Sequence, residues 1–146
     1  MISGIKGIVA TSVWLVLTSV VQAQALLPYQ NKKRPLIVFA PSEQHASLMR
    51  QKAAINGFRT ALSDRDLVVI YVVGEAVNAE FGAKPGMSAA SLRSTYRASE
   101  GVFRVLLIEK DGRTRVDSAA PLSANDIIAE LDRVPTRRDV VRQRSQ

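Results

Sequence analysis

Three segments of this chain are so rich in apolar residues that none of them can form a strand with one face in water. They cover residues 36–40, 67–73 and 102–108, the third interrupted only by Arg104, and they are rich in β-branched and aromatic side chains. A half-exposed strand alternates apolar and polar residues, whereas a strand covered on both faces is apolar throughout. The sequence therefore predicts a sheet whose central strands are these three segments.

The segments between these strands have the residue spacing of helices. Residues 42–62 carry an apolar stripe at helical spacing, formed by Leu48, Ile55, Phe58 and Leu62, with Gln51 in the same stripe. Ser42 is suited to cap the start of this helix, and residues 89–98 form a shorter helix candidate. Two buried strands joined by a helix form a parallel pair with a right-handed crossover, so we expect residues 36–73 to be a β-α-β unit.

The second half of the chain predicts a hairpin and a last helix. Residues 74–88 contain three glycines and a proline, so we expect an irregular connection there. The sequence Lys110-Asp111-Gly112-Arg113 favours a type I′ turn, which leads into a short antiparallel edge strand over residues 113–117. Ser123 and Asp126 resemble a capping box at the start of the last helix. The predicted order is β-α-β followed by α-β-β-α, around one mixed four-stranded sheet.

Residues 1–25 have the three parts of a secretory signal peptide. Lys6 is the only charge, residues 8–21 form the apolar core, and Ala23-Gln24-Ala25 places small residues where a signal peptidase cuts. The core is shorter than the roughly 20 residues that span a membrane. We therefore expect cleavage after Ala25 and a periplasmic or secreted protein without an integral membrane span. An uncleaved N-terminal anchor is the alternative.

The chain carries a formal charge of +7 and contains no cysteine. Without cysteine it has no disulfide framework, so its stability must come from one apolar core. Near the C-terminus a single acid, Asp139, accompanies five arginines, which are Arg133, Arg137, Arg138, Arg142 and Arg144. No aromatic side chain is interleaved with them to stack on bases, so nucleic acid is not expected as a partner. We expect residues 139–146 to be a basic, disordered tail.

Four motifs occur in order along the chain. They are RPLIVFAP at residues 34–41, DRDLVVI at 64–70, LLIEKDG at 106–112 and IAELDRVPTRR at 128–138. Together they resemble the bacterial domain-of-unknown-function family 4174, also called P-DUDES, which is related to animal Equarin-type and sushi-repeat extracellular proteins. The resemblance covers nearly all of residues 32–138. The chain departs from the family pattern at Glu109, where glycine is common, and at Thr136, where methionine is common.

The resemblance implies a fold but no settled activity. The implied α/β fold is thioredoxin-like and three-layered, with a βαβ unit plus a ββα unit around one mixed four-stranded sheet in residues 26–138. Proteins of this family are usually exported. The family supplies no catalytic residue that could be carried over to this sequence.

The turn that contains Pro41, Ser42 and His45 lies where a thioredoxin-like enzyme carries its redox thiols. Dithiol chemistry needs a thiolate nucleophile, and this chain has none. Ser42 could act as a nucleophile with His45 as its base, and the simpler interpretation is a helix cap beside a surface histidine. His45 is the only histidine, too little for a zinc site, so no catalytic residue, cofactor or metal is predicted.

Arg34, Arg137 and Arg138 lie inside the family-like motifs and are candidates for a surface that binds an anion or a partner protein. Salt bridges to acids such as Asp64, Asp66 or Asp132 are the alternative explanation for these arginines and for Arg65. The leading hypothesis is an exported binding or envelope-associated module, whose partner is an unknown envelope protein or an anionic ligand. An enzyme with a non-thiol site at the Pro41-Ser42-His45 turn is the rival, and a protein that functions through its arginine-rich tail is the third hypothesis.

Overall fold

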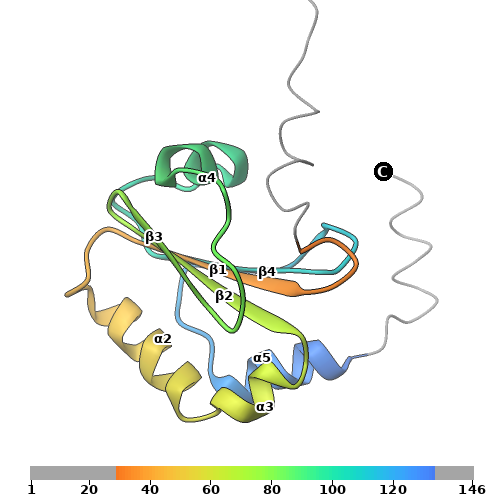
Figure 1. The fold of residues 1–146 in the computed structure, drawn as a ribbon. Helices are drawn as coiled ribbons and strands as arrows, with labels where there is room; N and C mark the ends of the chain where they lie inside the picture. The colour runs from red at the N-terminus through yellow and green to blue at the C-terminus, as the bar shows by residue number, and fades with distance from the viewer. Residues whose placement is uncertain (1–28, 134–146) are drawn as a thin grey trace, which may run out of the picture.

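The computed structural model describes residues 29–133 (Figure 1). The predicted signal segment 1–25 with its expected cleavage point after Ala25, the residues Arg137 and Arg138, and the predicted tail at 139–146 lie outside the described residues. Within the described range, no helix is both long enough and apolar enough to cross a membrane.

The fold is built on one five-stranded mixed sheet with the strand order β3-β2-β1-β4-β5. Its strands are β1 (Arg34–Ala40), β2 (Leu67–Val73), β3 (Ala76–Glu80), β4 (Arg104–Ile108) and β5 (Thr114–Ser118). β1 and β2 run parallel, and the other three strand pairs are antiparallel. The three apolar segments supply the three inner strands, as predicted, but the third strand begins at Arg104 rather than at Val102, which is exposed.

The sheet has five strands rather than the four expected, because residues 74–88 are not entirely irregular. Gly74 adopts a φ of 53°, and Val73 pairs with Ala76 across a two-residue hairpin turn. A positive φ in such a turn suits glycine and matches the twist of the two strands. The turn folds β3 back onto β2, where Val77 is buried.

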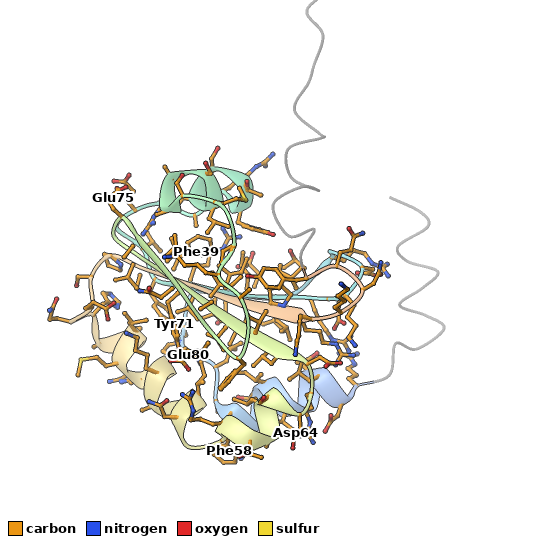
Figure 2. The ribbon with its side chains drawn as sticks, viewed as in Figure 1. Phe39, Phe58, Asp64, Tyr71, Glu75 and Glu80 are labelled. Atoms are coloured by element: carbon orange, nitrogen blue, oxygen red, sulfur yellow. The ribbon has the colours of Figure 1, made fainter. Side chains whose placement is uncertain are left out.

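Helices cover both faces of the sheet (Figure 1). α2 (Ala46–Asn56), α3 (Arg59–Ser63) and α5 (Ala124–Asp132) lie on one face, and α4 (Ala89–Tyr96) lies on the other. Successive side chains of β1 alternate between the two cores, because side chains along a strand point to opposite faces. Figure 2 shows Phe39 on the α4 side of the sheet and Tyr71 on the α2 side, in agreement with their separate clusters.

The helix expected over residues 42–62 begins later and is broken in two. Ser42 is not its N-cap: α2 starts at Ala46, and the N-cap residue His45 makes no side-chain capping bond. The helix ends at Gly57, which has a low helix propensity, and Phe58 leaves the helical conformation with a φ of −133°. As a result Phe58 is 42% exposed instead of lying in the apolar stripe, whereas Leu48, Ile55 and Leu62 are buried as predicted.

The hairpin and the last helix follow the sequence closely. Only Gly112 has a positive φ in the turn after β4, and its N–H donates to the oxygen of Glu109. The turn is therefore a type I turn closed by a left-handed glycine rather than the predicted type I′ turn. At α5, the Ser123 hydroxyl accepts a hydrogen bond from the Asp126 N–H at 3.1 Å, which confirms the predicted cap.

Candidate functional site

The carboxyl ends of the two parallel strands meet at one edge of the sheet. β1 ends at Ala40 and leads into the turn of residues 41–45, while β2 ends at Val73 and leads into the turn at Gly74. The Gly74 N–H donates to the oxygen of Ala40 at 3.3 Å, so the two turns are tied together. In open α/β sheets ligands bind outside this edge of the strands, which makes it the first place to look for a site.

A buried arginine of α4 forms hydrogen bonds with this edge of the sheet. Arg93 of α4 is only 7% exposed, and its two Nη atoms donate to the oxygens of Gly74 (3.1 Å) and Ala40 (3.2 Å). Its Nε is buried without a hydrogen bond, and no acidic side chain in residues 29–133 forms an ion pair with it. Arg93 therefore contacts the strand ends through two backbone oxygens, and its guanidinium also lies over the Phe39 ring, 6.0 Å from the ring centroid. Sequence reasoning missed this residue, since nothing in a short polar helix marks one arginine as buried.

His45 lies on this edge with its ring stacked on Phe103. The two ring centroids are 5.9 Å apart, and the ring planes differ by 2°. Phe103 is buried, His45 is half-buried, and the Nδ1 atom of His45 is buried without a hydrogen-bond partner. The simple interpretation of His45 as a surface residue is thus incomplete, because its ring forms part of the packing between α2 and the segment before β4.

The structure brings Ser42 and His45 into one turn but does not join their side chains. The His45 N–H donates to the backbone oxygen of Ser42 at 3.2 Å, and Ser42 is exposed beside the half-buried Pro41. A serine nucleophile needs its base within hydrogen-bond reach, at roughly 2.6–3.2 Å. No such bond links the Ser42 hydroxyl to His45 in the described part of the chain.

Of the three large apolar side chains that are exposed within residues 29–133, two belong to residues next to the stacked rings in the chain or one helical turn away. Met49, 59% exposed, lies one helical turn after His45, and its N–H donates to the His45 oxygen at 3.1 Å. Val102, 50% exposed, immediately precedes Phe103. We call His45, Met49, Val102 and Phe103 the strand-end patch. The sequence did not predict the exposure of Val102, because residues 102–103 were expected to lie within the third strand, whereas β4 begins at Arg104.

Arg34 lies at the opposite end of β1 from this patch and is held in ionic contacts. Its Nη1 donates to the oxygen of Leu131 at 2.8 Å, and its Nε lies 3.4 Å from Glu109. Glu109 also pairs with Arg115 at 2.9 Å, so the glutamate that departs from the family pattern bridges two arginines. Arg65 pairs with Asp132 at 2.7 Å. These contacts favour the salt-bridge interpretation of Arg34 and Arg65.

No metal centre is assembled in the described residues. Within residues 29–133 no three side chains of His, Asp or Glu converge closely enough to hold a metal ion. The arrangement at the strand ends offers an imidazole, a thioether and apolar surface.

The family comparison covers nearly the whole of this fold. The model of the domain of unknown function DUF4174 matches residues 25–139, a range that includes every strand and helix of the structure. The chain belongs to this family. The match confirms the family resemblance inferred from the four motifs, and the family description assigns no activity. No curated protein and no solved structure matches the chain significantly.

Proposed function

We propose that this member of the DUF4174 family is an exported, thioredoxin-like binding module that acts without thiol chemistry. In this proposal residues 1–25 are removed as a signal peptide, residues 26–138 form the domain, and residues 139–146 are a basic tail. The mature protein is then periplasmic or secreted and associates with an envelope protein.

The strand arrangement supports a thioredoxin-like fold. A β-α-β unit places β1 and β2 parallel, and the antiparallel hairpin of β4 and β5 joins β1 on its other side. Helices on both faces of the sheet, with α5 last, complete the order expected for a βαβ unit plus a ββα unit. β3 is then an addition at the outer edge of β2. Such a likeness concerns architecture and does not by itself specify an activity.

The strand-end patch is the observation that carries the binding function. At the edge where ligands usually bind in α/β sheets, Met49 and Val102 expose apolar surface next in the chain or one helical turn from the stacked rings of Phe103 and His45. Exposed methionine adapts to irregular partner surfaces, and an apolar centre is what distinguishes the core of a protein interface. The chain has no cysteine, so the patch cannot form a mixed disulfide with what it contacts.

Site-specific photo-crosslinking tests this binding function. The photoreactive amino acid p-benzoylphenylalanine is placed at position 102 of the mature chain, which is then irradiated in an envelope extract. Phe58 is the matched control position, because it is the third exposed large apolar residue and lies between α2 and α3, away from the patch. We expect a discrete protein adduct from position 102 that disappears in the Met49→Ser variant, and no corresponding adduct from position 58. Equal adducts from both positions, or an adduct insensitive to Met49→Ser, would contradict the proposal.

Export is tested separately by the mass of the native protein. We expect a chain that begins at Leu26, because cleavage after Ala25 follows the small residues Ala23 and Ala25. A chain that still begins at Met1 would instead indicate a membrane anchor.

A further inference from the structure

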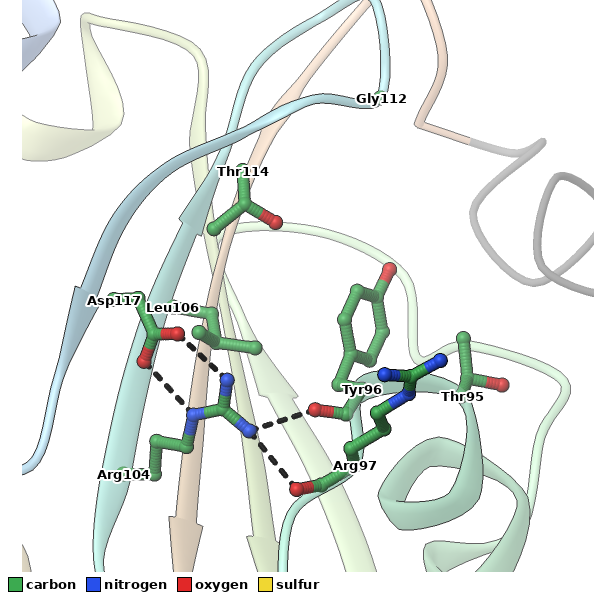
Figure 3. A pocket seen from close by; sticks show the side chains of 8 residues that line it. All are labelled: Thr95, Tyr96, Arg97, Arg104, Leu106, Gly112, Thr114 and Asp117. Carbon is green, nitrogen blue, oxygen red and sulfur yellow. Dashed lines mark hydrogen bonds and ion pairs between the residues drawn. The ribbon is translucent and has the colours of Figure 1, made fainter. Parts of the chain in front are cut away.

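A cavity lies apart from the strand-end patch and shares no residue with it. It measures about 340 Å³ and opens between the end of α4 and the β4–β5 hairpin. Its lining includes Tyr96 and Arg97 from the helix end, Arg104 and Leu106 from β4, and Thr114 and Asp117 from β5 (Figure 3). This α4–β5 cleft is within the size range of small-molecule sites, at the lower end of roughly 300–1,000 Å³.

One wall of the cleft is fixed and electrically balanced. Arg104 donates to both carboxylate oxygens of Asp117, at 2.8 and 2.6 Å, and its Nη1 donates to the backbone oxygens of Tyr96 (2.7 Å) and Arg97 (3.1 Å). The guanidinium thus neutralises the aspartate and occupies two carbonyls at the negative end of the helix dipole. This wall leaves no net negative charge that would repel an anion.

Arg97 supplies an additional positive charge at the cleft. It is exposed, and its guanidinium has no ion pair or hydrogen bond with another residue of the range 29–133. The residue ends α4 in the left-handed conformation, with φ 53° and ψ 42°, which a side chain other than glycine, asparagine or aspartate rarely adopts. Backbone strain of this kind accumulates at functional sites. Figure 3 shows the Tyr96 and Arg97 side chains projecting from the helix end in the same direction.

The rest of the lining combines an aromatic ring with polar groups. The half-buried ring of Tyr96 lies beside the cleft, and the buried Leu106 lies beneath it. Burial raises the pKa of Tyr96 to about 12, so the phenol stays neutral at physiological pH and adds no negative charge. Thr114 is exposed at the rim and brings a hydroxyl group to the lining.

We propose that the α4–β5 cleft binds a small organic carboxylate that has a flat apolar body. The carboxylate pairs with the guanidinium of Arg97, whose planar fork matches two carboxylate oxygens, and the body packs against Tyr96 above Leu106. The ligand is an anion, because Arg97 brings a positive charge to the cleft and forms no ion pair with an acidic residue of the described chain.

Nuclear magnetic resonance titration of the mature chain with benzoate tests this site, with benzamide as the uncharged analogue of the same shape. We expect benzoate to shift the amide signals of the residues that line the cleft, with an affinity near the millimolar range that suits so small a probe. Benzamide should bind at least about fivefold more weakly, because it lacks the charge that Arg97 pairs with.

Two variants of Arg97 separate the charge from the backbone conformation. Arg97→Asn and Arg97→Gly both remove the guanidinium while keeping residues that tolerate a positive φ, so the fold should persist. Each should weaken benzoate at least about fivefold, whereas the exposed Arg50→Gln on α2 should leave it unchanged. Equal binding of benzoate and benzamide, unaltered binding by folded Arg97 variants, or shifts confined to residues outside the cleft would overturn the proposal.

Discussion

The imidazole of His45 lies parallel to the phenyl ring of Phe103, with 5.9 Å between the ring centroids. This contact joins the start of α2 to the residue before β4, two segments that are 58 positions apart in the sequence. Met49, one helical turn after His45, and Val102, next to Phe103 in the chain, form the exposed part of the strand-end patch.

Replacing Phe103 with leucine should release His45 while keeping most of the buried volume. The ring current of Phe103 acts on the imidazole protons only while the rings are stacked, so their resonances should move toward the values of a free histidine. His45 is the only histidine, which makes its signals unambiguous in an untagged protein. We expect the unfolding free energy to fall by about 1 kcal/mol, as for other volume-conserving core changes. Unshifted imidazole signals in Phe103→Leu would contradict the stacked arrangement.

Removing the guanidinium of Arg93 should destabilise the edge of the sheet. Arg93→Met keeps an unbranched apolar stem but leaves the oxygens of Ala40 and Gly74 without the arginine donors. The expected loss is about 1–3 kcal/mol of unfolding free energy, measured by urea denaturation, because the Gly74 oxygen loses its arginine donor and the Ala40 oxygen keeps only the Gly74 N–H. The matched change Arg50→Met on the exposed face of α2 should stay within about 0.5 kcal/mol. An Arg93→Met protein as stable as the original would mean that these bonds contribute nothing net.

The stability of the domain should fall in acid. The hydrogen bonds from Arg104 hold the pKa of Asp117 below its ordinary value of 3.8, and contacts with Lys110 and Arg65 do the same for Asp66 and Asp132. A carboxyl group with a lowered pKa binds fewer protons in the folded chain than in the unfolded chain. Its contribution is therefore complete above the unfolded pKa and is lost as the pH falls through the folded pKa.

Urea titrations between about pH 6 and pH 3 measure this loss. The decrease in unfolding free energy should be shallower in Asp117→Asn than in the original protein, because one of the groups responsible has been removed. Glu75→Gln is the control, since Glu75 is exposed and has no ion pair in the described residues. An Asp117→Asn profile that parallels the original across this range would show that the pair with Arg104 contributes nothing to the pH dependence.

The purified mature protein should show no thiol–disulfide exchange and no thiol peroxidase activity. Both reactions begin with attack by a thiolate, and the chain contains no residue that can form one. The hydroxyl of Ser42 cannot be reversibly oxidised together with a second side chain in the way that two thiols form a disulfide. Insulin reduction and peroxide consumption are the assays, with a cysteine-containing thioredoxin as positive control. Turnover above buffer that survives repurification would refute this expectation.

The sheet was predictable where the side chains alone determine burial. The apolar runs at residues 36–40 and 67–73 specify strands covered on both faces, and they are fully paired along β1 and β2. The cap formed by Ser123 was equally local, since its bond spans three residues. In contrast, β3 has only one fully buried side chain, Val77, so its sequence carries almost no strand signal apart from the turn at Gly74.

The candidate site was only partly predictable, because its contacts join distant segments. The turn containing Ser42 and His45 was found from its place after a buried strand, but the stacking partner Phe103 comes from another part of the chain. The burial of Arg93 could not be predicted, because its partners are backbone oxygens and no feature of the sequence distinguishes it from an exposed arginine. The break at Gly57 was missed because the apolar stripe continues in register across it to Leu62.

The binding function of the strand-end patch is tested most directly with the partner captured through position 102. Its dissociation constant is measured for the original mature protein, for the double variant Met49→Ser with Val102→Ser, and for Phe58→Ser. The account predicts that the double variant binds at least about tenfold more weakly, or about 1.4 kcal/mol, because two exposed apolar contacts are lost. Phe58→Ser, which alters another exposed large apolar side chain elsewhere, should bind as the original does. A double variant with unchanged affinity, or an equal loss in Phe58→Ser, would contradict the assignment of the patch as the binding surface.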